Sequence, residues 1–321
     1  MRIFVTGGSG FIGGALLARL ARDHHVRAMA RSADSAAVVQ ERGGEAVECD
    51  LASVSVDHLR GTDVVVHCAA LASDWAPPGA FQTVNVDGTQ RMLAMARRAG
   101  IRRFVHMSSD SALFAGRPLV DVDEDTPYPH SSAYRYADSK RRAEQLVRAQ
   151  NSDDFETVCI RPVLVWGPGD TTVLNELVTM ADRGAFVWVD GGRHLVSTTH
   201  IDNVVQGVAL AIERGRPGGV YFLTDGDPVS YRDFFTDYLA TADRSVGSRS
   251  VPGVVVRVAG SAVERVWRLL RPQLRPPVTR EGAAILATTI TASSARAVRE
   301  LGYSPIPRQQ AMAALGRRPL G

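Results

Sequence analysis

A glycine-rich turn near the N-terminus sets the strongest limit on how this chain folds. Residues 6–13 read TGGSGFIG and follow directly on the apolar run at residues 2–6. After a strand, Gly7 permits a tight turn, Gly10 lets the backbone approach a pyrophosphate, and Gly13 allows close packing of the next helix. The amide groups at the start of that helix, together with its dipole, would bind the phosphates. The residues assigned to this dinucleotide site are Gly7, Ser9, Gly10, Phe11, Ile12 and Gly13.

Short β-rich runs alternate with longer helical patterns through the first half of the chain. Helices are expected at residues 15–22, 89–99 and 137–149, where apolar residues recur at i, i+3 and i+4. The expected strands are Arg2 to Thr6, Val26 to Ala30, Ala46 to Cys49, Val64 to Cys68, Phe104 to Met107 and Thr157 to Ile160. Strands that alternate with helices in this way predict an α/β fold with a doubly wound parallel sheet.

A second region begins after residue 162, where the regular alternation of short β-rich runs with helical patterns ends. A helical pattern at residues 172–183 opens it, and a helix and strand within residues 200–223 return to the sheet. The two regions are therefore expected to interleave along the chain. The predicted boundaries are residues 1–166 with 195–224 for the core, and residues 167–194 with 225–321 for a smaller, mostly helical C-terminal substrate lobe.

The charge and the cysteines exclude several function classes. The formal net charge is only +3 over 321 residues and the arginines are scattered, so the sequence shows no cluster of basic residues that would bind nucleic acid. Cys49, Cys68 and Cys159 lie far apart without metal-ligand spacing, and we expect buried thiols and no metal site. Neither a signal peptide nor an apolar stretch of 18 residues is present, and we expect a cytoplasmic protein.

A tyrosine and a lysine form the clearest candidate for catalysis. Tyr136 and Lys140 are one helical turn apart and lie on one helix face. An ammonium beside a phenol stabilises the phenolate and lowers a pKa that is ordinarily about 10. Lys140 is the only lysine among 37 Lys and Arg residues, and its compact charge suits this task better than a planar guanidinium. The alternative is an exposed lysine beside a half-buried tyrosine with no catalytic role.

The residues after the second expected strand bear on the choice of cofactor. An acidic residue there would accept the ribose hydroxyls of NAD, but residues 29–32 read MARS. Arg31 could pair with a 2′-phosphate instead, which favours NADP over NAD. The alternative is that Arg31 is a solvated loop cation or stacks on the adenine.

The motifs taken together resemble one known family along almost the whole chain. The chain is similar to the extended short-chain dehydrogenases/reductases, of the NAD-dependent epimerase/dehydratase superfamily. The matching motifs, in the order of the family, are TGGSGFIG, CDL at 49–51, VVVHCAALAS, NVDGT at 85–89, HMSSDSALF, Tyr136 with Lys140, RPVLVWGPGD, THIDNVVQGVALA and YFLTDGDPVSYRDFF. The resemblance implies a Rossmann core that binds NAD(P), a smaller lobe that binds substrate, and a homodimer.

The resemblance also assigns roles to individual residues. Ser109 would be the catalytic hydroxyl that hydrogen-bonds the substrate oxygen. Its neighbour Ser108, the residue most easily confused with it, would contact the cofactor. Tyr136 would transfer the proton, and Lys140 would assist it and bind the nicotinamide ribose. The remaining cofactor contacts implied are Asp50 and Leu51 at the adenine, Ala69, Ala70 and Leu71 along the cleft, Asn85 as an organising group, and Pro162 and Val163 at the carboxamide.

The branch of the family is less sharply defined by the sequence. The resemblance argues against a dehydratase, because the dehydratases of this family carry an Asp-Glu pair at this point and Asp110 is followed here by Ser111. The later motifs resemble the 3β-hydroxysteroid dehydrogenase-like group and the 2-alkyl-3-oxoalkanoate reductases, which implies a ketone or secondary alcohol on a hydrophobic skeleton. A nucleotide-sugar epimerase and a non-catalytic, dinucleotide-sensing regulator remain as alternatives. The sequence leaves sterols, β-keto acids and polyketide-like ketones undistinguished.

Apolar residues of the second region were considered as the substrate site. They are Val173, Leu174, Leu177, Val178, Met180, Val254 to Val256, Trp267, Leu269 and Leu270, and the alternative is that they form the core of the lobe. Residues 251–271 also predict an amphipathic helix with several arginines. Such a helix either packs on the lobe or lies at the mouth of the substrate site and contacts a membrane surface.

Overall fold

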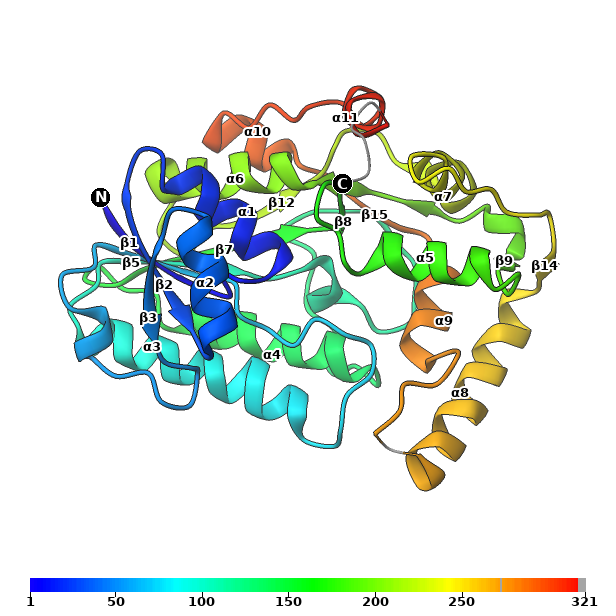
Figure 1. Ribbon diagram of the computed structural model, residues 1–321, viewed down its shortest axis with the longest axis horizontal. Coiled ribbons are helices and arrows are strands. Elements are labelled where there is room, and N and C mark those ends of the chain that lie inside the picture. The colour runs from blue at the N-terminus through cyan, green and yellow to red at the C-terminus, as the bar shows by residue number, and fades with distance from the viewer. Residues whose placement is uncertain (272, 317–321) are drawn as a thin grey trace.

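A seven-stranded sheet forms the centre of the molecule (Figure 1). The computed structural model describes residues 1–271 and 273–316. The strand order is β12-β7-β5-β4-β1-β2-β3, and every neighbouring pair in it is parallel. The strands are β1 Arg2–Thr6, β2 His25–Ala30, β3 Glu45–Glu48, β4 Val64–His67, β5 Arg103–Met107, β7 Glu156–Pro162 and β12 Val220–Leu223. The predicted doubly wound parallel sheet is confirmed.

Helices cover both faces of this sheet (Figure 1). One face carries α1 (Phe11–Leu20), α2 (Ala33–Glu41), α6 (Ile201–Arg214) and α10 (Ala295–Leu301). The other carries α3 (Gly88–Arg98) and α4 (Arg135–Ala149). Apolar side chains such as Leu17 and Val208 fill the first layer, and Met92 and Phe104 fill the second. Burial of these two layers is the main source of stability for such an arrangement.

The register of the strands brings distant segments to one edge of the sheet. Thr6 at the end of β1 lies opposite His67 at the end of β4, and His67 lies opposite His106 near the end of β5. Met107 in turn pairs with Ile160 of β7. The loops that follow these strands therefore meet at the carboxyl edge, which is where ligands bind in open α/β sheets.

The C-terminal region is mainly helical, as predicted, and it also contains a second sheet. Its helices are α5 Val173–Asp182, α7 Tyr231–Ala240, α8 Gly253–Leu270, α9 Arg280–Leu286 and α11 Arg308–Leu315. The second sheet has the order β13-β10-β15-β6, formed by Val229–Ser230, Leu195–Val196, Ile290–Ala292 and Leu119–Val122. Two parallel pairs join β11 (Thr198–His200) to β8 (Leu164–Trp166) and β14 (Ser250–Val251) to β9 (Trp188–Val189). The buried aromatic residues Trp166, Phe234 and Tyr238 form the centre of this region. The domain boundaries proposed from sequence stay a prediction.

Candidate functional site

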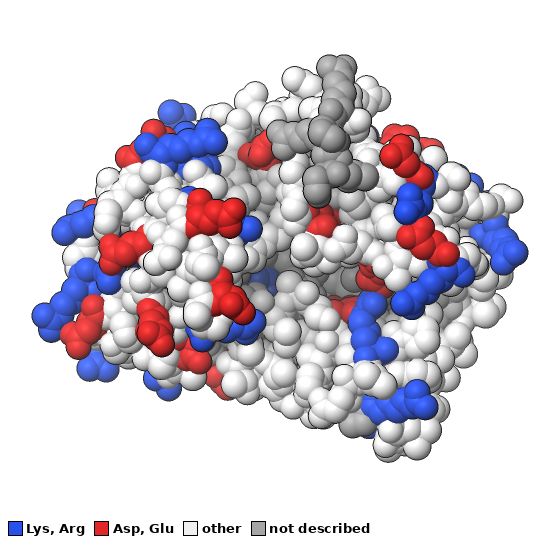
Figure 2. Space-filling view, viewed as in Figure 1, with Lys and Arg blue, Asp and Glu red and all other residues white. Residues whose placement is uncertain are grey.

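A cavity of about 1190 Å³ opens at the carboxyl edge of the sheet, between the sheet and the C-terminal region. Figure 2 shows this face of the molecule hollowed near its centre. Most residues predicted for the site line the cavity: Gly7, Ser9, Gly10, Phe11, Ile12, Gly13, Arg31, Asp50, Leu51, Ala69, Ala70, Ser108, Ser109, Tyr136, Pro162 and Val163. The other three predicted residues, Leu71, Asn85 and Lys140, are not part of this lining. Segments separated by more than 150 residues in sequence therefore contribute to one site.

The glycine turn is shaped to admit an anion at the start of α1. Gly7 has a φ of +74°, and a Cβ there would lie only 2.9 Å from the Ala69 amide nitrogen. A Cβ on Gly13 would lie 2.2 Å from the Gly7 carbonyl oxygen, so this close approach of helix to turn requires glycine. Gly10 is the N-cap of α1 and no side chain caps the helix, which leaves its first amide groups available to a ligand. The turn thus fits the pyrophosphate of a dinucleotide.

Asn85 organises the segment that lines the other side of the cofactor cleft. Its Oδ1 accepts a hydrogen bond from the Leu71 amide at 2.7 Å, and its Nδ2 donates to the Leu71 carbonyl at 3.2 Å. The same Nδ2 donates to the Ser139 hydroxyl at 2.9 Å. Asn85 therefore ties residues 69–71 to helix α4, which carries Tyr136.

Two charged residues predicted to lie at the adenine end of the cavity, Arg31 and Asp50, differ in whether they have a protein partner. Arg31 is exposed and makes no hydrogen bond or ion pair to any other residue in the described part of the chain. Asp50 instead closes its own turn, because its Oδ1 accepts from the Ser53 hydroxyl and the Ser53 amide, both at 2.7 Å. These hydrogen bonds from Ser53 lower the pKa of Asp50. Of the two charged groups, only the guanidinium is left without a protein partner.

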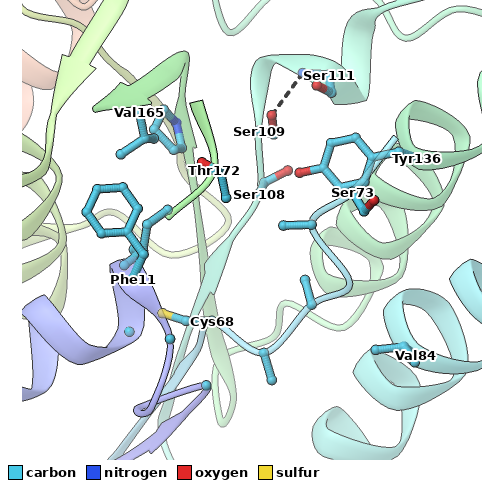
Figure 3. Close-up of a pocket in the computed structure, with 18 of the residues that line it drawn as sticks. Phe11, Cys68, Ser73, Val84, Ser108, Ser109, Ser111, Tyr136, Val165 and Thr172 are labelled. Carbon is cyan, nitrogen blue, oxygen red and sulfur yellow. Dashed lines mark hydrogen bonds between the residues drawn. The ribbon is translucent and has the colours of Figure 1, made fainter. Parts of the chain in front are cut away.

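Tyr136 and the Ser109 loop face one another across the substrate end of the cavity (Figure 3). The Ser109 hydroxyl donates to the Asp110 carboxylate at 2.8 Å and accepts from the Ser111 amide at 3.1 Å. The Ser108 hydroxyl is engaged elsewhere, since it donates to the buried carboxylate of Glu144. This difference favours Ser109 as the hydroxyl that serves the site. Asp110 is a participant that the sequence analysis used only to exclude a dehydratase.

Burial and nearby carboxyl groups control the protonation of these residues. Burial raises the pKa of Asp110 to about 6, although its hydrogen bonds to Ser109 and Ser111 oppose that change. The pKa of Tyr136 is raised above its ordinary value, first by burial and then by the charges of Asp110 and Glu281, while a hydrogen bond with Ser109 lowers it. The phenol is therefore neutral at physiological pH.

Lys140 lies one turn after Tyr136 on α4, as predicted, but its ammonium group serves the backbone of β5. Its Nζ donates to the Met107 carbonyl at 2.7 Å, and the side chain is buried. Burial lowers the pKa of Lys140 to about 8, against the favourable charge of Glu144. Burial and the two carboxyl groups raise the pKa of Tyr136, and the assistance of this phenol by Lys140 stays a prediction.

Glu281 is a site residue that the sequence analysis missed. It lines the cavity from α9, and its carboxylate accepts from the backbone amides of Tyr136 at 3.2 Å and Ala137 at 3.0 Å. The N-cap residue of α4, Tyr134, supplies no side-chain hydrogen bond, so Glu281 caps this helix from a distant part of the chain. Burial raises the pKa of Glu281 to about 8, while the two amide bonds oppose that change.

Ionisation of Glu281 is expected to make stability fall as pH rises. The ordinary pKa of this group is 4.5 and its folded value is about 8, so the folded protein holds the proton over this window while the unfolded chain releases it. The free energy of unfolding should then decrease by up to about 1.4 kcal/mol per pH unit between about pH 5 and pH 8. Glu281→Gln should flatten that dependence in urea denaturation, whereas Glu213→Gln, on the exposed side of α6, should not. An unchanged pH dependence in Glu281→Gln would contradict the assignment.

The apolar residues considered for substrate binding mostly lie elsewhere. Of that set, Val173 lines the cavity, whereas Leu177 is buried in the core of the C-terminal region with Leu174 and Val178 packed against it. Leu269 and Leu270 are exposed. Other apolar side chains line the cavity instead, among them Phe11, Phe114, Val165, Val196, Tyr231, Ile285 and Ile290. The expected apolar surface therefore exists, but its residues come from other elements.

Comparison with known proteins agrees with this site. Residues 4–251 match the model of the 3-beta hydroxysteroid dehydrogenase/isomerase family. A 4-hydroxy-2-methyl-3-oxo-4-farnesyl-3,4-dihydroquinoline-1-oxide ketoreductase of Stigmatella aurantiaca is 43% identical over 98% of this chain and 96% of its own length. A 2-alkyl-3-oxoalkanoate reductase of Stenotrophomonas maltophilia is 35% identical over 95% of each chain. A dTDP-glucose 4,6-dehydratase of Streptomyces venezuelae, solved with NAD, has the same fold, with a TM-score of 0.77, 23% identity, and coverage of 99% and 96%.

The fold and the site define an NAD(P)-dependent oxidoreductase of the extended short-chain dehydrogenase/reductase type. Within that class, the chain belongs to the 3-beta hydroxysteroid dehydrogenase/isomerase family. NAD and NADP both agree with the dinucleotide turn. In the described part of the chain, no helix combines the length and apolar character needed to cross a membrane.

Proposed function

We propose that this protein reduces a ketone to a secondary alcohol on a bulky hydrophobic substrate, with Tyr136 as the proton donor. The observation that carries the proposal is that Tyr136, Ser109 and the glycine turn line one cavity. The chemistry supplied by a bound nicotinamide is hydride transfer. The protein then has to bind the carbonyl oxygen, donate one proton to it and exclude water.

The residues of the site divide these tasks among them. The Ser109 hydroxyl, which donates to Asp110 and accepts from the Ser111 amide in this structure, would turn its proton to the substrate oxygen when a ketone binds. The Tyr136 Oη–H bond breaks as its proton passes to the developing alkoxide. The raised pKa of Tyr136 keeps this proton in place beforehand, which suits reduction better than oxidation. Lys140 holds α4, the helix that bears Tyr136, against β5 by donating a hydrogen bond to the Met107 carbonyl.

The lining of the cavity and the named relatives support a hydrophobic substrate. Phe114, Tyr231 and Ile285 line the cavity beside Tyr136, and such surfaces bind apolar skeletons with few polar anchors. One relative is named for a farnesylated quinoline oxide and another for 2-alkyl-3-oxoalkanoates, both of which carry an oxo group on a large apolar frame. We infer the same general class for this chain.

A panel of ketones with NADPH oxidation as the readout tests the proposal. Long-chain 3-oxoacids, 2-alkyl-3-oxoalkanoates and steroid ketones should be reduced with a higher kcat/KM than short ketones of the same functional group. UDP-glucose, incubated with NAD, provides the matched test for epimerase activity. Epimerisation without reduction of any hydrophobic ketone would overturn the proposed function.

A preference for NADPH over NADH is expected from Arg31. Its guanidinium has no protein partner at the adenine end, and a phosphate pair there would be worth at least the 1.4 kcal/mol that corresponds to a tenfold difference in affinity. Fluorescence titration should show NADPH binding about tenfold more tightly than NADH. Arg31→Ala should remove most of the difference while leaving NADH affinity near wild type. Equal affinities for the two cofactors in the unaltered protein would contradict the prediction.

A further inference from the structure

Helix α8 presents its apolar face to solvent. The exposed side chains that share this face are Val254 (75% exposed), Val255 (53%), Val258 (65%), Val266 (47%), Leu269 (79%) and Leu270 (75%), with Ala259 and Ala262 between them. Leu274, four residues beyond the helix, is 57% exposed as well. An amphipathic helix of a globular protein normally turns this stripe inward. In α8, a helix of 18 residues, a wide apolar stripe faces solvent instead.

The inward face of α8 combines half-buried apolar residues such as Val263 and Trp267 with polar residues, and contacts of the polar residues fix the orientation of the helix. Arg257 donates to the Gly116 carbonyl at 2.5 Å. Glu264 pairs with Arg268 and accepts from the Arg280 amide at 2.9 Å. A Cβ on Gly260 would lie 3.0 Å from the Thr279 carbonyl, so the helix approaches the segment before α9 closely at this point. These contacts prevent α8 from rotating its valines and leucines inward.

The exposed charged residues on α8 and directly after it are basic. Arg265 lies at the border of the apolar face and Arg271 follows the helix, both exposed. Glu264 is the one acidic residue of α8, and it is held inward by Arg268. Figure 2 shows mostly uncharged atoms over α8, at the lower right, with basic side chains beside them. A second copy docked on the same stripe would bring like charges together, whereas an anionic lipid surface complements them.

We propose that the outward face of α8 docks on the surface of an anionic phospholipid bilayer. Valines and leucines would enter the boundary between headgroups and acyl chains, and Arg265 and Arg271 would remain among the phosphates. The contact is peripheral. Its strength comes from the apolar area removed from water together with attraction to anionic headgroups.

The docking face lies next to the proposed catalytic cavity. Helix α8 packs against α9, and α9 lines the cavity through Glu281 and Ile285. Arg268 lies 4.2 Å from the Trp75 ring centroid, and Arg275 pairs with Asp74, which also lines the cavity. If the proposed function holds, a substrate dissolved in the bilayer would enter beside α8. This consequence rests on the proposed function, whereas docking itself does not.

Co-sedimentation with vesicles tests the docking. The full protein should pellet with vesicles of phosphatidylcholine containing phosphatidylglycerol, and less with phosphatidylcholine alone. A double substitution, Val258→Glu with Leu269→Glu, should weaken binding at least about tenfold, because each carboxylate would have to leave water or hold the helix away. Val298→Glu, on an exposed apolar position of α10, is the matched control and should bind as wild type.

Two further measurements separate the outcomes. Reduction of a ketone dissolved in water should be unchanged in the double variant, so a protein that binds vesicles but reduces no ketone would contradict only the proposed function. Sedimentation velocity without lipid measures self-association. Unaltered protein that stays in the supernatant, binding that the double variant retains, or a dimer that the same variant disrupts would each overturn the docking proposal.

Discussion

Tyr136→Phe is expected to reduce turnover of a hydrophobic ketone by about 100-fold or more, while NADPH affinity stays near the wild-type value. The substitution removes one hydroxyl from a side chain that lines the cavity opposite Ser109. Because the raised pKa of Tyr136 keeps its proton in place, this hydroxyl is the donor best suited to the developing alkoxide. Single-turnover kinetics with saturating NADPH would measure the chemical step directly.

Tyr221→Phe is the matched control for this result. The Tyr221 hydroxyl hydrogen-bonds Glu300 at 3.2 Å and lies outside the cavity lining, so its loss should leave turnover within about twofold. Thermal unfolding of both variants would show whether either loses its fold. Near-normal turnover of folded Tyr136→Phe would remove Tyr136 from the mechanism.

Lys140→Arg is expected to reduce turnover by about 100-fold or more although the charge is retained. The ammonium occupies a closed position where Nζ donates to the Met107 carbonyl, and the side chain is only 3% exposed. A planar guanidinium is larger and donates in fixed directions, so it would displace β5 or α4. The chain leads from β5 into Ser109, and α4 carries Tyr136 near its start, the two residues proposed for catalysis.

Lys140→Met separates the role of charge from the role of size. It fills a similar volume without a cation, and the folded variant should also lose activity if the ammonium is required. Affinity for NADPH and thermal unfolding should be recorded for both variants. Full activity in Lys140→Met would show that the lysine is a packing residue. Full activity in Lys140→Arg would show that the shape of the cation is unimportant.

The central sheet could be predicted because its strands are buried on both faces. Residues 64–67 and 104–107 read as short apolar runs, and buried parallel strands of this kind leave a continuous signal in sequence. Helix α2 was not predicted, since only Ser35 and Val39 in it are buried and its polar side gives little periodicity. The second sheet was also missed, because strands of two to four residues are too short to show alternation.

Some residues of the site could be predicted from local sequence motifs, whereas others reach the site only through the tertiary fold. The glycine turn and the Tyr136–Lys140 pair are contiguous motifs, so their placement follows from the sequence alone. Glu281 contacts the Tyr136 amide across 145 residues, and no local pattern distinguishes it from a surface glutamate. The amphipathic character of α8 was readable, but the direction of its apolar face depends on tertiary contacts such as that of Arg257 with Gly116.

Because Glu281 caps α4, the C-terminal region cannot be removed or exchanged without affecting the helix that bears Tyr136. The helix that bears Tyr136 receives its terminal hydrogen bonds from α9, so a fragment ending before residue 280 would expose unpaired amides at the start of its catalytic helix. Chimeras that exchange the C-terminal region between relatives must therefore preserve an acceptor at this point of contact. The two regions are thus coupled at the start of α4 through the Glu281 carboxyl group, although each region carries a hydrophobic core of its own.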